Sequence, residues 1–136
     1  MNNILTAVYG QFSGSSLSSD VGGRMYLDAA PDGTQFPYIV YFIISAYPDN
    51  TFSEHFTDSL IQFSLFSASP GATEITTMYK DLISLYDDKT FSITANTLVW
   101  MREDNVATMV EDTVVRDASV RVKHWAVDFE LKTSLV

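Results

Sequence analysis

The spacing of hydrophobic positions changes along the chain, and each spacing predicts a type of element. Apolar residues recur every three or four positions over 3–12 and 75–86, which is the period of an amphipathic helix. They alternate with polar residues over most of 55–66, as in a strand that buries one face. Residues 38–44 are all apolar or aromatic, so this strand must be covered on both faces. One face can pack on the core, and the other needs a helix layer, a second sheet or another subunit.

Turn residues bound the first two long strands. The apolar strand extends over 38–46 and ends at the turn Tyr47-Pro48-Asp49-Asn50. The strand over 55–66 follows after a short polar segment, and this spacing predicts an antiparallel hairpin. Its apolar positions Ile61, Phe63 and Leu65 share one face, which we expect to be buried.

Capping residues bound the second helix. Ser69 is the expected N-cap, Pro70 takes the first helical position, and the helix ends at Asp87-Asp88-Lys89. Leu82 lies at the centre of its apolar stripe, so we expect it to be buried against a sheet. Between the first helix and the first strands, Leu17–Val21 has the composition of a single helical turn.

The C-terminal half reads as a series of strands. They lie near 90–94, 97–103, 106–112 and 118–132. Arg102–Asn105 reads as a polar turn between two of them. In the last strand the apolar phase changes near Lys123-His124, where a one-residue β-bulge would keep both halves on the same core. The chain is therefore predicted to be one α+β domain over 1–136, with a mostly antiparallel β-sheet and with the N-terminal helix and the longer amphipathic helix packed on one face.

Charge and composition limit the kinds of site and partner that this protein can have. The 136 residues have a net charge of −9 and include no cysteine, which excludes disulfides and Cys-based zinc sites. The sequence has no basic patch that would grip phosphates, although an acidic protein can lie beside DNA without holding it. We see neither a secretory signal nor an apolar run of membrane-spanning length, and we expect no membrane partner.

Candidate chemistry is sparse. His55 and His124 lie far apart in the sequence, and neither has a carboxylate at the spacing of a helical metal site. The Ser-rich segment 13–19 lacks the context of an activated nucleophile, and no glycine cluster matches a phosphate loop. Acidic pairs such as Asp87-Asp88 read as solvated turn charges. We therefore predict no enzyme activity, no cofactor and no metal site.

The layout resembles the tail-completion, or tail-terminator, proteins of long-tailed bacteriophages. Four features carry the resemblance. A short N-terminal helix precedes Gly23-Arg24 and Ala30-Pro31-x-Gly33-Thr34, and Phe36-Pro37-Tyr38-Ile39-Val40 leads the first long strand. A strand with Ile61–Phe66 precedes the Pro70–Asp88 helix, and the final long strand contains Trp125-Ala126-Val127-Asp128-Phe129. The resemblance implies a non-enzymatic virion protein, assembled in the host cytoplasm. Such a protein forms a hexameric ring at the head-proximal end of the tail tube, ends tube polymerisation, joins the tail to the head-completion or connector protein, and lets DNA pass through its pore.

Two sets of residues are expected to serve this role. The subunit interface is assigned to one side of the apolar strand, with the residues Tyr38, Val40, Phe42 and Ile44. The pore or rim is assigned to acids at strand ends, namely Glu103, Asp104, Glu111 and Asp112, with Asp87 and Asp88 next. The alternative for these acids is that they only solvate the outer surface. The alternatives for the whole chain are another ring protein of the head–tail neck, or a small α+β enzyme or ligand-binding domain.

Overall fold

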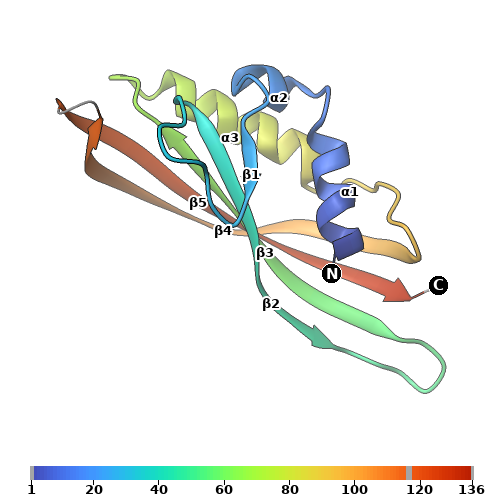
Figure 1. Cartoon of the computed structure of the whole chain (residues 1–136). Helices are drawn as coiled ribbons and strands as arrows, with labels where there is room; N and C mark the ends of the chain where they lie inside the picture. The colour runs from blue at the N-terminus through green and yellow to red at the C-terminus, as the bar shows by residue number, and fades with distance from the viewer. Residues whose placement is uncertain (1, 116–117, 136) are drawn as a thin grey trace.

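The computed structural model describes residues 2–115 and 118–135 (Figure 1). Within these residues the chain forms three helices and five strands. The helices are α1 (Asn2–Phe12), α2 (Ser16–Asp20) and α3 (Thr73–Tyr86). The strands are β1 (Met25–Leu27), β2 (Tyr38–Pro48), β3 (Phe56–Ser67), β4 (Asn96–Val115) and β5 (Ala118–Leu135).

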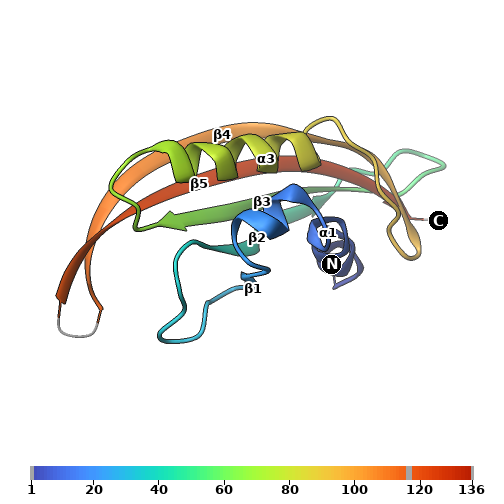
Figure 2. The ribbon, with the colours of Figure 1, turned by 90° about the horizontal axis from the view of Figure 1, so that it is seen from above.

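The strands form one sheet in the order β1-β2-β3-β5-β4. β1 pairs with β2 in parallel, and the other neighbours are antiparallel, including the predicted β2–β3 hairpin. The helices lie on one face of the sheet, with α3 running along its centre (Figure 2). The predicted α+β fold is thereby confirmed.

The core lies between the helices and the sheet. On the helix side of β3, Ile61, Phe63 and Leu65 are fully buried, as their alternation predicts. They face the apolar stripe of α3, in which Leu82 is also fully buried. The hydroxyl of Tyr86, the last residue of α3, donates a 2.7 Å hydrogen bond to the carbonyl of Val8 in α1, which ties the two helices together.

The start of α3 differs from the prediction. The helix begins at Thr73, not at Pro70, and its first turn has no side-chain cap. The preceding residues have other partners. The amide of Ser69 donates to Oγ of Ser67, and the Nζ of Lys123 on β5 donates to the carbonyls of Ser69 and Pro70. These contacts hold the segment in a non-helical conformation.

The predicted strand and turn boundaries before β5 are wrong. Residues 90–94 form no strand and are joined to β4 by one isolated bridge between Ile93 and Asn96. The predicted strands at 97–103 and 106–112 are one continuous strand, β4. Arg102–Asn105 is not a turn, because only Asp104 steps out of register with β5. A bulge absorbs one residue without ending the strand, and polar side chains are tolerated at an edge.

β5 also lacks the predicted bulge at Lys123-His124. Its register with β3 is continuous there, and the shifts against β4 arise in β4 itself. The apolar phase changes because different faces are buried along the strand. Val122 is buried on the side away from the helices, whereas Val127 packs in the helix-side core.

The sheet extends beyond the helices at both ends. The β2–β3 hairpin projects past α1 at one end, and the β4–β5 hairpin projects past α3 at the other (Figures 1 and 2). These extensions expose large apolar side chains, among them Tyr47 on the first hairpin and Val110 on the second. The fold therefore has a covered centre and two uncovered ends.

Candidate functional site

The face of the sheet opposite the helices is the main candidate for an interaction surface, and we call it the helix-free face. Strand register places its side chains in rows that cross the sheet from β2 to β4. The three central rows are Tyr38–Phe66–His124–Met109, Val40–Ser64–Ala126–Ala107 and Phe42–Gln62–Asp128–Asn105. Three of the four predicted interface residues therefore lie on this face.

One row of the helix-free face is aromatic. Phe36 packs against Tyr38 at 5.3 Å between ring centroids, and Tyr38 stacks on Phe66 at 4.8 Å. Phe66 in turn stacks on the imidazole of His124 at 4.3 Å. Offset and tilted ring contacts of this kind add to the stabilisation from buried area. The row therefore connects β2, β3, β5 and the loop before β2 on one face of the sheet.

The aromatic row ends at an acidic residue on β4. The Nδ1 of His124 lies 3.0 Å from Oε1 of Glu111. Burial, and then the negative charge of Glu111, raise the pKa of Tyr38. Glu111, one of the predicted pore residues, is thus attached to the row that begins at the predicted interface residue Tyr38.

The predicted interface residues differ in exposure along β2. Val40 is buried within the subunit, so its cover does not require a neighbour. Tyr38 and Phe42 are half-buried. Ile44 lies at the β2 bulge, opposite no residue of β3, and is 45% exposed. The strand therefore becomes more exposed toward the hairpin tip, where Phe52 is fully exposed.

A groove of about 390 Å³ crosses the same side of the sheet near the β2–β3 hairpin. Its lining includes Tyr47, Trp100 and Lys132. The Nζ of Lys132 lies 2.7 Å from Asp49 and 3.4 Å from Asp58, and the hydrogen bond from Lys132 lowers the pKa of Asp49. The groove is therefore lined by the aromatic side chains of Tyr47 and Trp100 and by the ion-paired Lys132.

The predicted pore acids fall into two groups on β4. In the first group, Glu103 accepts a hydrogen bond from the Tyr79 hydroxyl, and its amide donates to Asp87 at 2.9 Å. Burial, and then the Glu103 carboxylate, raise the pKa of Tyr79 to about 12. Nearby, Asp88 lies 4.0 Å from Arg102. Glu103 and Asp87 therefore link β4 to the C-terminal end of α3.

The second group lies on the part of β4 that projects beyond α3. Glu111 contacts His124, and Asp112 lies 3.6 Å from Arg121 across the hairpin. Eight positions of β4 separate Glu103 from Glu111, which corresponds to about 26 Å of extended strand. The four acids are thus on one edge strand but do not form one cluster within a subunit.

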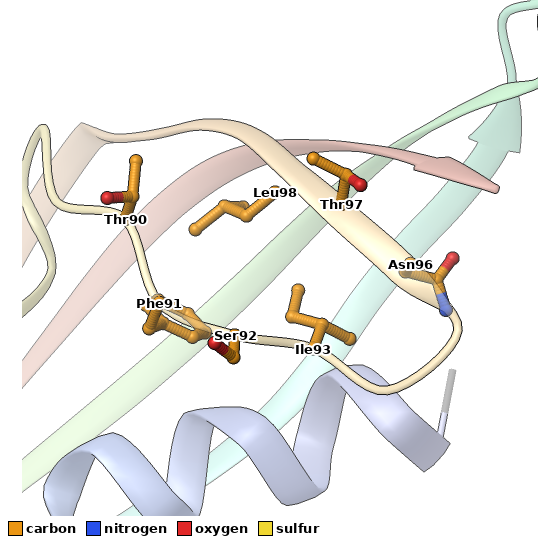
Figure 3. A pocket seen from close by; sticks show the side chains of 7 residues that line it. All are labelled: Thr90, Phe91, Ser92, Ile93, Asn96, Thr97 and Leu98. Carbon is orange, nitrogen blue, oxygen red and sulfur yellow. The ribbon is translucent and has the colours of Figure 1, made fainter. Parts of the chain in front are cut away.

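Another cavity, of about 440 Å³, lies between residues 90–93 and the first residues of β4 (Figure 3). Its lining consists of Thr90, Phe91, Ser92, Ile93, Asn96, Thr97 and Leu98. None of these side chains is an acid or a base at neutral pH, so the cavity lacks the groups needed for general acid–base catalysis. We assign it no chemical role.

Sequence reasoning missed a contact that positions the aromatic row. The Nε of Arg24 donates to the carbonyl of Pro37 at 3.1 Å, and its Nη2 donates to that of Phe36 at 3.5 Å. The Phe36–Pro37 peptide is cis. Two segments noted in the sequence, Gly23-Arg24 and Phe36-Pro37, thus meet directly before Tyr38. Their separate positions in the sequence give no signal of this contact.

Sequence reasoning also missed an acid pair between α2 and α3. Burial, a hydrogen bond with Asp81 and the charge of Asp81 raise the pKa of Asp20 to about 6. Over residues 2–115 and 118–135, no three His, Asp or Glu side chains gather as metal ligands would. In the same part of the chain, each helix is too short or too polar to span a bilayer.

A family model described as "Tail completion protein gp17" matches residues 6–134. No curated protein matches the chain. Among solved structures, a chain from the virion of a native gene transfer agent particle has the same fold, with a TM-score of 0.73 at 15% identity. The match covers 95% of this chain and 92% of that one. The chain therefore belongs to the tail completion protein gp17 family, whose members are structural proteins of the bacteriophage virion.

Proposed function

We propose that this protein forms a hexameric ring at the head-proximal end of the tail tube. The ring ends tube polymerisation, joins the tail to the head connector and lets DNA pass through its pore. The observation that carries the proposal is the match of nearly the whole chain to the tail-completion family. The uncovered ends of the sheet support it, because an assembly protein needs surfaces for neighbours above, below and beside it. The role is structural and requires no catalytic residue.

The helix-free face is the proposed lining of the pore, which departs from the expectation that Tyr38, Val40 and Phe42 on this face form the subunit interface. Its rows carry four acids (Asp58, Glu111, Asp128, Glu130) and two bases (Arg102, Lys132). A surface with excess negative charge repels phosphates, so DNA slides past it without being held. Both bases on this face already have partners within the subunit. Lys132 is ion-paired with Asp49, and the guanidinium of Arg102 lies 4.4 Å from the centroid of the Trp100 ring.

Removal of the protein tests the proposed position. Particles assembled without it should yield heads without tails and tail tubes of uncontrolled length, measured by negative-stain electron microscopy. Heads without tails beside tubes of normal length would instead indicate another ring of the neck. A reconstruction of the neck that shows a single copy of this chain would contradict the ring.

Charge reversal tests the proposed pore. Asp104 and Glu111 are changed together to Lys. Asp112 stays unchanged because it alternates with Glu111 along β4 and pairs with Arg121 on the other face of the sheet. Asp32, an exposed acid outside the sheet, is changed to Lys as the control. Glu103 stays unchanged because Tyr79 binds it. We expect slower DNA ejection at low salt and recovery as added salt screens the new charges. Ejection at the wild-type rate at low salt would show that these acids do not line the pore.

A further inference from the structure

β4 is an edge strand of the sheet, and its middle has no charged side chain. Over the described residues, β4 pairs with β5 on one side and with no strand on the other. Between Asp104 and Glu111 its sequence includes Val106-Ala107-Thr108-Met109-Val110, which we call the β4 window. Apolar edges of this kind pair with other strands, and proteins that avoid such pairing place charges, prolines or bulges there.

The β4 window is also the regular part of the strand. Both register shifts of β4 lie before Asn105, and from there to Val115 the strand pairs with β5 without interruption. Met109 and Val110 are exposed, the latter at 63%. Bulges and charges, which protect an edge from pairing, are therefore both absent from the β4 window.

The opposite edge of the sheet has a matching gap. β1 pairs with β2 only at Ile39–Tyr41, which leaves the outer edge of Phe42–Tyr47 without a strand partner in the described structure. This β2 window reads Phe-Ile-Ile-Ser-Ala-Tyr and also contains no charge, although the β2 bulge at Ile44 lies within it. Ile44 and Tyr47 are exposed in it, at 45% and 59%. The two windows have nearly the same length.

We infer that the β4 window of one subunit pairs with the β2 window of the next, so that neighbouring sheets join edge to edge. This inference rests on the proposed ring and specifies its subunit contact. Three successive antiparallel pairings make β4 run opposite to β2 within one sheet. Rotation about an axis near the strand direction preserves strand directions, so the new pair is antiparallel. A contact between two different edges closes into a ring when the rotation closes.

Charge disfavours the main alternative, a twofold pairing of two β4 windows. An antiparallel pair centred on Thr108 would place Asp104 opposite Asp112 at both ends. Like charges directly opposite each other destabilise a strand pair. The β2 window brings no charge of its own, so it avoids this repulsion within the paired segments.

Cysteine cross-linking tests the contact directly, because the chain has no cysteine. Thr108→Cys is combined, one at a time, with a Cys replacement at each position from Phe42 to Tyr47. Assembled tails are oxidised and analysed on non-reducing gels. A disulfide requires Cα atoms roughly 4.4–6.8 Å apart, so we expect covalent multimers for one or two neighbouring positions only. Thr108→Cys alone should remain monomeric.

The outcomes separate this inference from the proposed function. Dimers from Thr108→Cys alone would indicate β4–β4 pairing and overturn the inference. Absence of cross-links at every position, in particles whose neck reconstruction contains several copies of the chain, would also overturn it but leave the ring intact. Particles with one copy at the neck would contradict the ring itself.

A charge placed in the β4 window gives a second test with a matched control. Val110→Glu introduces a carboxylate into the window, and Val99→Glu does so outside it on the same strand, where Val99 is 44% exposed. We expect both variants to keep the wild-type melting curve, and only Val110→Glu to lose incorporation into tails. Normal incorporation of folded Val110→Glu protein would contradict the edge contact.

Discussion

The centre of α3 offers a sharp test of the fold. Leu82 is fully buried between α3 and the sheet, whereas Leu85, three residues further along the same helix, is half-buried. Leu82→Ala removes three carbons, and at about 0.8 kcal/mol per buried carbon the transfer cost is about 2.4 kcal/mol. A residual cavity adds to this, and buried Leu→Ala substitutions cost about 2–5 kcal/mol in total.

The measurement is urea unfolding followed by far-UV circular dichroism, with Leu85→Ala as the control. For Leu82→Ala we expect a lower midpoint with an unchanged slope, because the surface exposed on unfolding is nearly the same. Leu85→Ala should cost less, since part of its side chain already contacts water. A loss below about 1 kcal/mol for Leu82→Ala, or equal losses for both variants, would refute this assignment of the core face.

Three further predictions concern side chains in polar contacts. Tyr86→Phe deletes the buried hydrogen bond to Val8 and should lower the free energy of unfolding by about 1 kcal/mol, measured in urea. The raised pKa of Asp20, about 6 against an ordinary 3.8, means that the folded state binds the proton more tightly. Stability should therefore decrease as the pH rises from about 4 to about 7, and Asp20→Asn should reduce this decrease in thermal melts. Arg24→Lys loses the paired bonds to two carbonyls and should cost about 1–2 kcal/mol, with a wild-type midpoint as the contradicting result.

Periodicity predicted the elements whose signal extends over many residues. The stripe of α3 and the alternation of β3 each repeat several times. Leu82, Ile61, Phe63 and Leu65 are buried as expected, although β3 also buries Ser59, Ser64 and Ser67. The start of α3 could not be read in the same way. It depends on Lys123, which lies 54 positions from Ser69 in the sequence and binds its carbonyl. Capping rules consider only neighbouring residues, so they cannot predict a contact between residues so far apart in the sequence.

Two other errors have a common physical cause. The polar residues Arg102–Asn105 resemble a turn, but the same composition suits a bulged edge strand whose side chains reach water. The apolar phase of β5 suggested a bulge because only one buried face was considered. The aromatic row was missed for a related reason, since Tyr38, Phe66 and His124 become neighbours only through the register of three strands.

The proportions of the two layers explain why this fold exposes so much of its sheet. α3 has 14 residues, which span about 21 Å. β4 has 20 residues, which span about 66 Å when extended. One helix of that length covers only the middle of such a strand, whatever its sequence. Stability comes from this covered middle, where the core residues gather. The strand length beyond it adds little to a core within one subunit, so a role in contacts between proteins accounts for it better than folding does.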